Sequence, residues 1–150
     1  MKIQSKIIRF KTKKEFEYID ITDKVQGFIK ESKVKDGQIL VFSRHTTMAI
    51  RVNEKEDGFF KDFEQFFTKI LPKEKYYKHN DLNIRTENLV CSDEGEECLN
   101  GHSHCQHFLL GTSETIPVVD SKLALGRWQK VIAIELCGPR DREVHLQLLS

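Results

Sequence analysis

The chain has 150 residues, a usual length for one domain, and at this length a core can be buried without disulfides or a structural metal. Its 24 basic and 23 acidic residues are interspersed, which disfavours a nucleic-acid partner because such proteins usually carry a basic surplus. Apolar runs are too short for a signal peptide or a membrane span. We therefore expect one domain over residues 1–150, no membrane partner, a cytoplasmic location and reduced thiols on all four cysteines.

The beginning of the chain predicts two strands followed by a helix. Residues 2–10 and 16–21 are rich in Ile, Phe and Tyr and are separated by a polar stretch, so we expect an antiparallel pair of strands. Thr22 can then cap a helix. The apolar face of this helix is expected to cover a sheet and to carry Val25, Phe28 and Ile29.

The middle of the chain contains the strongest helix prediction. Two strands are expected first, at residues 39–42 and 48–52, around a polar link that contains His45, Thr46 and Thr47. From Asp57 onward, phenylalanines repeat at helical spacing until Pro72 ends the pattern. Residues 73–97 are polar and lack a sustained period, and a long irregular segment inside a domain is often functional.

The last part of the chain predicts one short helix and three strands. Asn100 can cap a helix that runs to Leu110 and stops at Gly111. Strands are expected at residues 115–119, 131–137 and 143–149. In the final strand apolar and polar residues alternate, which indicates one buried face, carried by Val144, Leu146 and Leu148.

Half of the six histidines fall within this short helix, as His102, His104 and His107. Neutral imidazole is the commonest metal ligand and a common general base near neutral pH, so these residues predict a metal or catalytic site. His104 and His107 share a helix face, whereas His102 and His104 point to nearly opposite sides. At most two of the three are therefore expected to act together.

Other polar residues could belong to the same site. His79 lies in the irregular segment, and His45 lies between two expected strands, where it is either a functional residue or a hydrogen-bonded turn residue. Asn53, Glu54 and Asp57 could bind Mg²⁺ or orient a histidine. For Asp57, a plain helix cap is an equally good interpretation.

Arginines and cysteines suggest two further kinds of site. Arg140 and Arg142, beside a turn, suit a phosphate or carboxylate ligand, with surface ion pairs as the alternative. A structural zinc site could combine Cys98 and Cys105 with the helical histidines, but their spacing is not that of the usual fingers or ribbons. The chain contains no Walker loop, dinucleotide glycine pattern, nucleophile elbow or His-Glu-x-x-His helix. Standard nucleotide-hydrolase, lipase and zincin functions therefore lack support.

Several of these motifs together resemble one known family. They are His45-Thr-Thr-Met-Ala-Ile50, Asn53-Glu54, His79, Asn100-Gly-His-Ser-His104, Leu110-Gly111, Ile116-Pro-Val118, Leu125-Gly-Arg-Trp-Gln129, Glu135 and Gly138-Pro-Arg140. In this order and spacing the chain looks like the YjbQ-like family, also called the secondary thiamine-phosphate synthase family. The resemblance runs from about residue 39 to the C-terminus, and the combination of motifs is specific although each is weak alone.

The resemblance implies a fold, an assembly and an activity. The implied fold is an α+β single domain with a β-sandwich-like core of mixed or antiparallel sheets and about three helices. The implied assembly is a homotrimer with a His-lined site for a divalent metal ion, such as Zn²⁺, Mg²⁺ or Mn²⁺. The implied activity is a weak or secondary condensation of a pyrimidine diphosphate with a thiazole phosphate, both small phosphorylated metabolites, which yields thiamine phosphate and releases pyrophosphate.

The resemblance also implies roles for single residues. Catalytic roles fall on His45, Glu54, His104 and Glu135; substrate-binding roles fall on Thr46, Asn53, Gln129 and Arg140; metal binding falls on His79 and His104. Arg127 and Cys137 depart from the family pattern, and they put the identity of the substrate in doubt rather than the fold. Two alternative functions stay open: a metal-dependent hydrolase of another phosphorylated metabolite, and a non-catalytic trimer that binds a metabolite or a metal.

Overall fold

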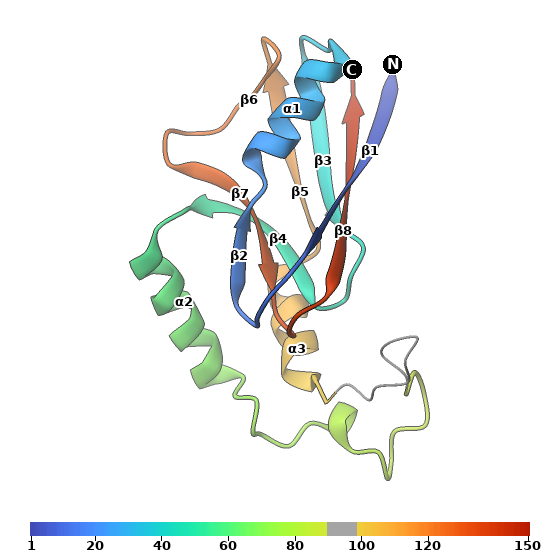
Figure 1. The fold of residues 1–150 in the computed structure, drawn as a ribbon, viewed down its shortest axis with the longest axis vertical. Helices are drawn as coiled ribbons and strands as arrows, with labels where there is room; N and C mark the ends of the chain where they lie inside the picture. Colours follow the sequence, from blue (N-terminus) through green and yellow to red (C-terminus); the bar gives the residue numbers. More distant parts are fainter. Residues whose placement is uncertain (90–98) are drawn as a thin grey trace.

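The computed structural model describes residues 1–89 and 99–150 of the chain. Within them, strands and helices are arranged as an α+β fold (Figure 1), which confirms the expected class. The elements are β1 (Ile3–Lys11), β2 (Glu17–Asp20), α1 (Thr22–Ser32), β3 (Gly37–Ser43), β4 (Met48–Glu54), α2 (Asp57–Ile70), the 3-10 helix η1 (Lys78–Asn80), α3 (Gly101–Leu110), β5 (Ser113–Val119), β6 (Lys122–Leu123), β7 (Gln129–Glu135) and β8 (Asp141–Leu149).

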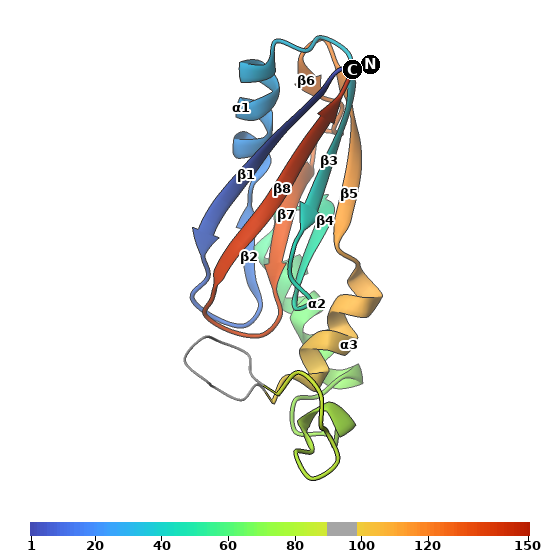
Figure 2. The ribbon, with the colours of Figure 1, turned by 90° about the vertical axis from the view of Figure 1, so that its right-hand side faces the viewer.

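The strands form two antiparallel sheets. The larger sheet has the order β1-β8-β3-β5-β6, and the smaller has the order β2-β7-β4. Figure 2 shows the long strands of the larger sheet in front of the smaller one, with both chain termini at one end and α3 at the other. No helix of the described residues is long and apolar enough to cross a membrane.

The prediction that the first two strands pair with each other is wrong. β1 pairs with β8 and β2 pairs with β7, so the chain changes sheets between them. The Thr12 amide donates to the Arg140 carbonyl, and the Phe16 amide donates to the Glu135 carbonyl. These bonds attach the intervening residues to the other end of the chain, and the polar stretch that looked like a hairpin turn is a crossover between layers.

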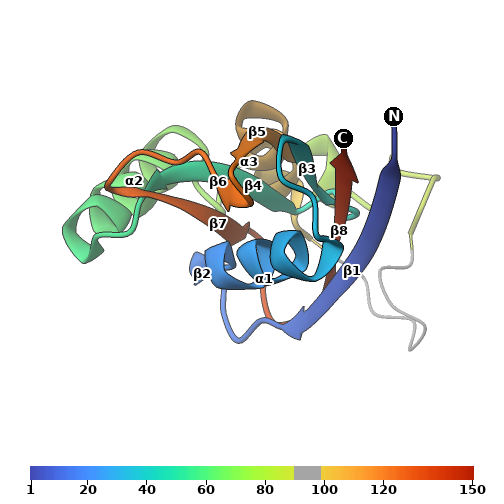
Figure 3. The same cartoon turned by 90° about the horizontal axis from the view of Figure 1, so that it is seen from above.

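The main core lies between the two sheets. β8 contributes the alternating residues Val144, Leu146 and Leu148, which confirms the one-sided pattern expected for this strand. β4 and β7 contribute Ile50 and Ala133 from the facing sheet. Helix α1 adds its predicted apolar face to this core, and Figure 3 shows it beside β1 and close to β7.

The outer face of the smaller sheet is covered by α2. Ala49, Ile132 and Ile134 point away from the main core and pack against the phenylalanine face of this helix, which includes Phe67. The Phe60 ring stacks on Tyr18 of β2 with centroids 4.1 Å apart. Strand β7 is thus buried on both faces, which explains its nearly continuous apolar sequence.

Two helix starts differ from the expected caps. Thr22 is the first residue of α1 rather than its cap, because its hydroxyl accepts the Val131 amide and Ile21 occupies the cap position. Glu56, not Asp57, caps α2, since its carboxylate accepts the amides of Gly58 and Phe59, each at 2.6 Å. Both differences are shifts of one residue and leave the helices where the periodicity predicted them.

Candidate functional site

One end of the molecule gathers most of the predicted polar residues. The β3–β4 link (residues 44–47), the β7–β8 turn (residues 136–140), η1 and α3 all meet there, opposite the chain termini (Figure 2). η1 is the only helix or strand in the described part of the segment between α2 and α3. The loop-like character expected for this segment therefore holds over the residues that the structure describes.

Two histidines meet at this end. The rings of His79 in η1 and His104 in α3 have centroids 4.5 Å apart and are tilted by 55°. Gly101 allows this approach, because a Cβ atom there would lie 2.6 Å from Tyr77 Cβ. The Gly101 amide also donates to Asn80 Oδ1 at 2.8 Å, which attaches the start of α3 to η1. The pair predicted to act together is therefore brought together.

Both imidazoles are held in the neutral form. Burial, and then the neighbouring His79 and His107, lower the pKa of His104 from 6.5 to about 4. Burial and the Arg85 guanidinium lower the pKa of His79. Neutral imidazole retains a nitrogen lone pair at pH 7, so this pair can accept a proton or bind a metal ion.

Asn100 links His79 to a cysteine. The His79 Nε2 proton is donated to Asn100 Oδ1 at 3.2 Å, and Asn100 Nδ2 donates to Cys137 Sγ at 3.3 Å. Arg140 Nη2 also donates to this sulfur, at 3.4 Å. This arrangement leaves the lone pair of His79 on Nδ1. Cys137, which departs from the family pattern, therefore lies within the site and contacts Arg140.

His107 lies three residues after His104 on α3 and acts on it electrostatically, and we call His79, His104 and His107 the histidine cluster. The Nε2 atom of His107 is buried and lacks a hydrogen-bond partner among the described residues. Burial, and then Arg142, lower its pKa, so this ring is neutral as well. The sequence contained the signal for His107, its spacing of three residues from His104, but the resemblance favoured His79 instead.

His102 lies on the other side of α3, as the helical geometry predicted. Its side chain is only 2% exposed, and its Nε2 lies 3.0 Å from Glu15 Oε1 and 3.2 Å from Ser103 Oγ. Since His102 and His104 face different neighbours, they do not form a common zinc site. Cys91 and Cys98 lie outside the described residues, and Cys105 and Cys137 are free thiols.

His45 lies in the β3–β4 link, beside the start of β8. Its Nε2 accepts the backbone amide of Glu143 at 2.8 Å. Burial, and then Arg142, lower its pKa. Thr46 is exposed next to it, whereas Thr47 is buried and its hydroxyl accepts from Arg142 Nη2 at 3.0 Å. Arg142 thus binds Thr47 of the link, and its charge acts on both His45 and His107.

Glu135 is completely buried at the end of β7 and is saturated with hydrogen bonds. Its carboxylate accepts Arg142 Nε at 2.6 Å, Arg142 Nη2, and the Thr12 hydroxyl at 2.9 Å. It also accepts the backbone amides of Cys137 and Gly138, at 2.9 and 3.3 Å. A carboxylate with these partners holds the turn that carries Cys137, and no oxygen is left open to a substrate. The catalytic role expected for Glu135 stays a prediction.

Three predicted site residues lie at the opposite end of the smaller sheet. Asn53 and Glu54 end β4, and Gln129, which pairs with Glu54, begins β7. All three are exposed. A strand rises about 3.3 Å per residue, so the length of β4 places them about 20 Å from the Met48–Glu135 end. One chain therefore does not bring them to the histidine cluster.

The histidine cluster offers donor atoms that suit a divalent metal ion. His79 and His104 supply two neutral imidazoles, which suit Zn²⁺ and other transition metals. Among residues 1–89 and 99–150, no group of three or more His, Cys, Asp or Glu side chains is close enough to hold an ion. This part of a single chain therefore offers two of the three or four protein ligands that a zinc site normally has.

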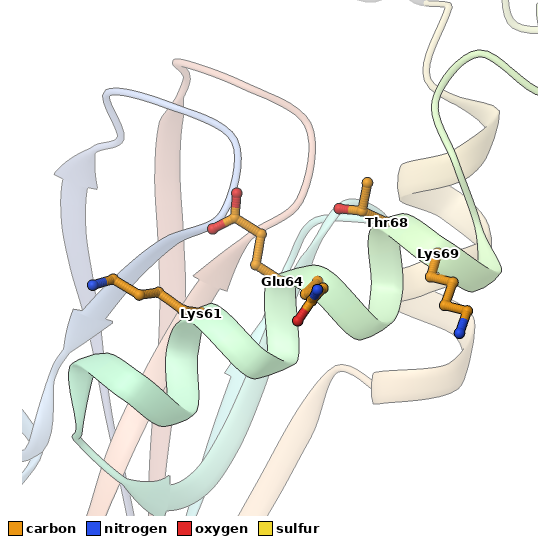
Figure 4. A pocket seen from close by; sticks show the side chains of 5 residues that line it. Lys61, Glu64, Thr68 and Lys69 are labelled. Carbon is orange, nitrogen blue, oxygen red and sulfur yellow. The ribbon is translucent and has the colours of Figure 1, made fainter.

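A surface hollow away from the histidine cluster has no imidazole or thiol group in its lining. It runs along α2 and is lined by one face of that helix, with Lys61, Glu64, Thr68 and Lys69 pointing outward (Figure 4). All of these residues are exposed, and no histidine or cysteine lines the hollow. Among the described residues, the candidate metal-binding and proton-transfer groups are therefore those of the histidine cluster.

Comparison with known proteins gives consistent matches along the chain. A family model described as "UPF0047 protein YjbQ-like" matches residues 6–150. A UPF0047 protein of Archaeoglobus fulgidus is 37% identical over 142 residues, which cover 95% of this chain and 98% of that protein. The UPF0047 protein YugU of Bacillus subtilis is 30% identical over 146 residues, covering 97% and 98%.

Solved structures agree with the sequence matches. A Sulfolobus solfataricus structure, described as a YbjQ-like protein of unknown function, superposes with a TM-score of 0.85 at 31% identity, covering 99% of this chain and 98% of that one. A Clostridium acetobutylicum protein described as a YjbQ/UPF0047 family member superposes with a TM-score of 0.79 at 33% identity, covering 95% and 98%. Neither description names an activity or a ligand.

Proposed function

The chain belongs to the UPF0047 (YjbQ-like) family, and from this premise we propose that its histidine cluster is the active centre of an enzyme acting on small phosphorylated metabolites. The reaction proposed is a weak or secondary thiamine-phosphate synthase activity, with release of pyrophosphate. The observation that carries the proposal is the contact of His79 with His104, two neutral imidazoles beside arginines. A cytoplasmic location stays a prediction.

The charges around the pair suit a phosphorylated substrate. Arg85 and Arg140 both lie close enough to lower the pKa of His104, although burial has the larger effect. Guanidinium groups bind phosphate oxygens in a fork and can stabilise the charge that develops on a departing diphosphate. A neutral imidazole next to them can take up or return a proton during the same reaction.

A divalent metal ion would fit the proposed chemistry. His79 and His104 would hold it, with the remaining ligands supplied by substrate oxygens, water or another chain. When bound, such an ion neutralises charge on a leaving diphosphate. Metal analysis of untagged protein should find less bound metal in His79→Ala and His104→Ala than in the wild type. Equal metal content in all three proteins would remove these residues as ligands.

A homotrimer would explain how predicted site residues that lie far from the histidine cluster in one chain can still belong to the site. Asn53, Glu54 and Gln129 could complete the site of a neighbouring subunit, because they are exposed and lie far from the histidines of their own chain. Helix α3 also carries two exposed apolar side chains, Phe108 at 91% and Leu109 at 64% exposed, which a second copy could cover. Light scattering of the wild type and of Phe108→Asp tests this assembly: a monomeric wild type would contradict it.

The proposed reaction can be tested by pyrophosphate release from the two thiamine precursors. We expect His79→Ala and His104→Ala to lower the rate about 100-fold or more, since acid–base groups contribute 10²–10⁴. His145→Gln is the matched control, because this histidine lies on β8 and faces away from the main core. Undiminished release in both cluster variants would refute the assignment.

The same assay separates the alternatives. Release of inorganic phosphate from other phosphorylated metabolites, without pyrophosphate release, would identify the hydrolase. Saturable binding of a phosphorylated metabolite without turnover would identify the non-catalytic trimer. Either result would keep the histidine cluster as the ligand site and replace the proposed reaction.

A further inference from the structure

The hydrogen bond to His45 determines which ring nitrogen carries the proton. The backbone N–H of Glu143 donates to His45 Nε2 at 2.8 Å. An N–H donor requires a lone pair, so Nε2 is unprotonated and the proton of the neutral ring is on Nδ1. The amide cannot turn away, since Glu143 belongs to β8, which is paired on one side with β1 and on the other with β3.

The same contact opposes a positive charge on His45. Protonation of Nε2 would place two N–H groups against each other and break the bond to the amide. The charged groups that act on the ring are Arg142 and Arg44, which oppose protonation, and Glu135 and Glu143, which favour it. Burial has the largest effect and opposes protonation together with the arginines, so the pKa of His45 is lowered. The ring is therefore neutral when the pH is near 7.

The Nδ1 atom remains available to a ligand. It has no hydrogen-bond partner among the described residues, and it is not a buried orphan like His107 Nε2. The exposed Thr46 follows it in the chain. Arg142 acts electrostatically on both His45 and His107, and the β3–β4 link that carries His45 lies at the same end of the molecule as the histidine cluster.

We propose that His45 binds an anionic oxygen of the ligand through its neutral Nδ1–H and does not transfer protons. The ligand group is a phosphate or a carboxylate, because an N–H donor of fixed direction binds an oxygen acceptor, and such a hydrogen bond is stronger when the acceptor is charged. This inference rests on the proposed function in taking the ligand of the histidine cluster to be anionic. It assigns proton transfer to His79 or His104 and makes His45 a binding residue.

The tautomer can be measured directly by NMR on protein with isotope-labelled histidine. We expect His45 to show protonated Nδ1 and unprotonated Nε2 at neutral pH, and to keep this pattern below pH 6.5, near which an ordinary histidine takes up its proton. Inorganic phosphate or acetate, added separately, should shift the Nδ1 resonance. The anion that causes the larger shift at equal concentration is the one that fits better. A protonated Nε2, or no response to either anion, would overturn the inference.

Two variants of His45 test the roles of its two ring nitrogens separately. In His45→Gln the amide oxygen can still accept from Glu143 while the Nδ1 donor is lost. In His45→Asn an N–H group can remain near the Nδ1 position. We expect the fold of both to be kept, and phosphate binding to weaken about 10- to 100-fold in the Gln variant but only a few-fold in the Asn variant. Equal binding by the Gln variant and the wild type would contradict the proposed donor.

Phosphate binding by the His45 variants tests the binding role, whereas pyrophosphate release by the wild type tests the proposed reaction. Absence of pyrophosphate release by the wild type, together with loss of phosphate binding in His45→Gln, would refute the synthase reaction and support the binding role. Pyrophosphate release by the wild type, together with unchanged phosphate binding in His45→Gln, would support the synthase reaction and refute the binding role. Circular dichroism of each variant confirms that the binding change is not a loss of fold.

Discussion

The imidazole of His79 packs against the imidazole of His104 at 4.5 Å, although one comes from an irregular segment and the other from a helix. The contact depends on Gly101, on the Asn80 side chain and on Asn100, which hold η1 against the start of α3. Since both rings are neutral, they can act together without mutual charge repulsion. Changes to either ring or to these supports should therefore have measurable consequences.

Stability should decrease as the pH is lowered through the range in which an ordinary histidine is protonated. The pKa of His104 is lowered from 6.5 to about 4, so between these values the unfolded chain binds more protons than the folded chain. The stabilising effect of its neutral form is complete above pH 6.5, decreases toward pH 4 and changes no further below that. Urea unfolding between about pH 7.5 and about pH 5 measures this slope.

The variant His104→Gln identifies the source of that slope. Glutamine does not titrate, so the dependence of the unfolding free energy on pH should become shallower in this variant. His79 and His107 should account for part of the remaining slope, because their pKa values are lowered too. An unchanged slope would show that His104 is not the group responsible.

Gly101→Ala should destabilise the protein by about 1–3 kcal/mol, as expected for overpacking. The added methyl group would lie 2.6 Å from Tyr77 Cβ and 2.9 Å from Tyr77 Cγ, so the start of α3 must move away from η1. Activity at the histidine cluster should decrease with it. Thermal unfolding and the pyrophosphate assay measure both effects.

Gly27→Ala is the matched control for this substitution. Gly27 lies inside α1, and a Cβ atom there meets nothing within 4 Å. Alanine favours a helix interior over glycine by about 0.5–1 kcal/mol, so this variant should be slightly more stable than the wild type. A Gly101→Ala protein as stable as the Gly27→Ala protein would mean that the contact with Tyr77 is easily relieved.

Glu135→Ala should cost about 3–5 kcal/mol of folding free energy, because it leaves the buried Arg142 guanidinium without its counter-charge. The turn that carries Cys137 would also lose its main acceptor. Glu31→Ala is the control, since its ion pair with Lys6 is exposed and should contribute about 0–1 kcal/mol. Denaturant titration compares the two, and similar small losses would argue against a structural role for Glu135.

Asn100→Ala should lower activity about 10- to 100-fold, as is typical when a residue that orients a ligand histidine is removed. The substitution deletes the acceptor of the His79 Nε2 proton and the donor to Cys137. Asn83→Ala is a suitable control, because Asn83 is exposed on the same segment. Wild-type rates in Asn100→Ala would show that His79 does not need this support.

Local sequence patterns predicted most elements and several site residues. The phenylalanine spacing predicted α2, the alternation in β8 predicted its buried face, and the position of Gly111 predicted the end of α3. The opposite orientations of His102 and His104 also followed from helix geometry alone. Such features depend on residues within a few positions of one another, and a single sequence therefore contains the information that determines them.

Only the tertiary structure decided the relationships between distant segments. β1 and β2 pair with different partners because strand pairing depends on the burial of both sheets rather than on the short connection between the two strands. The contact of His79 with His104, the saturation of Glu135 by Arg142, and the distance of Glu54 from both depend on how the layers pack. Periodicity determines which face of an element is buried; the partner of that face depends on contacts between residues far apart in the chain.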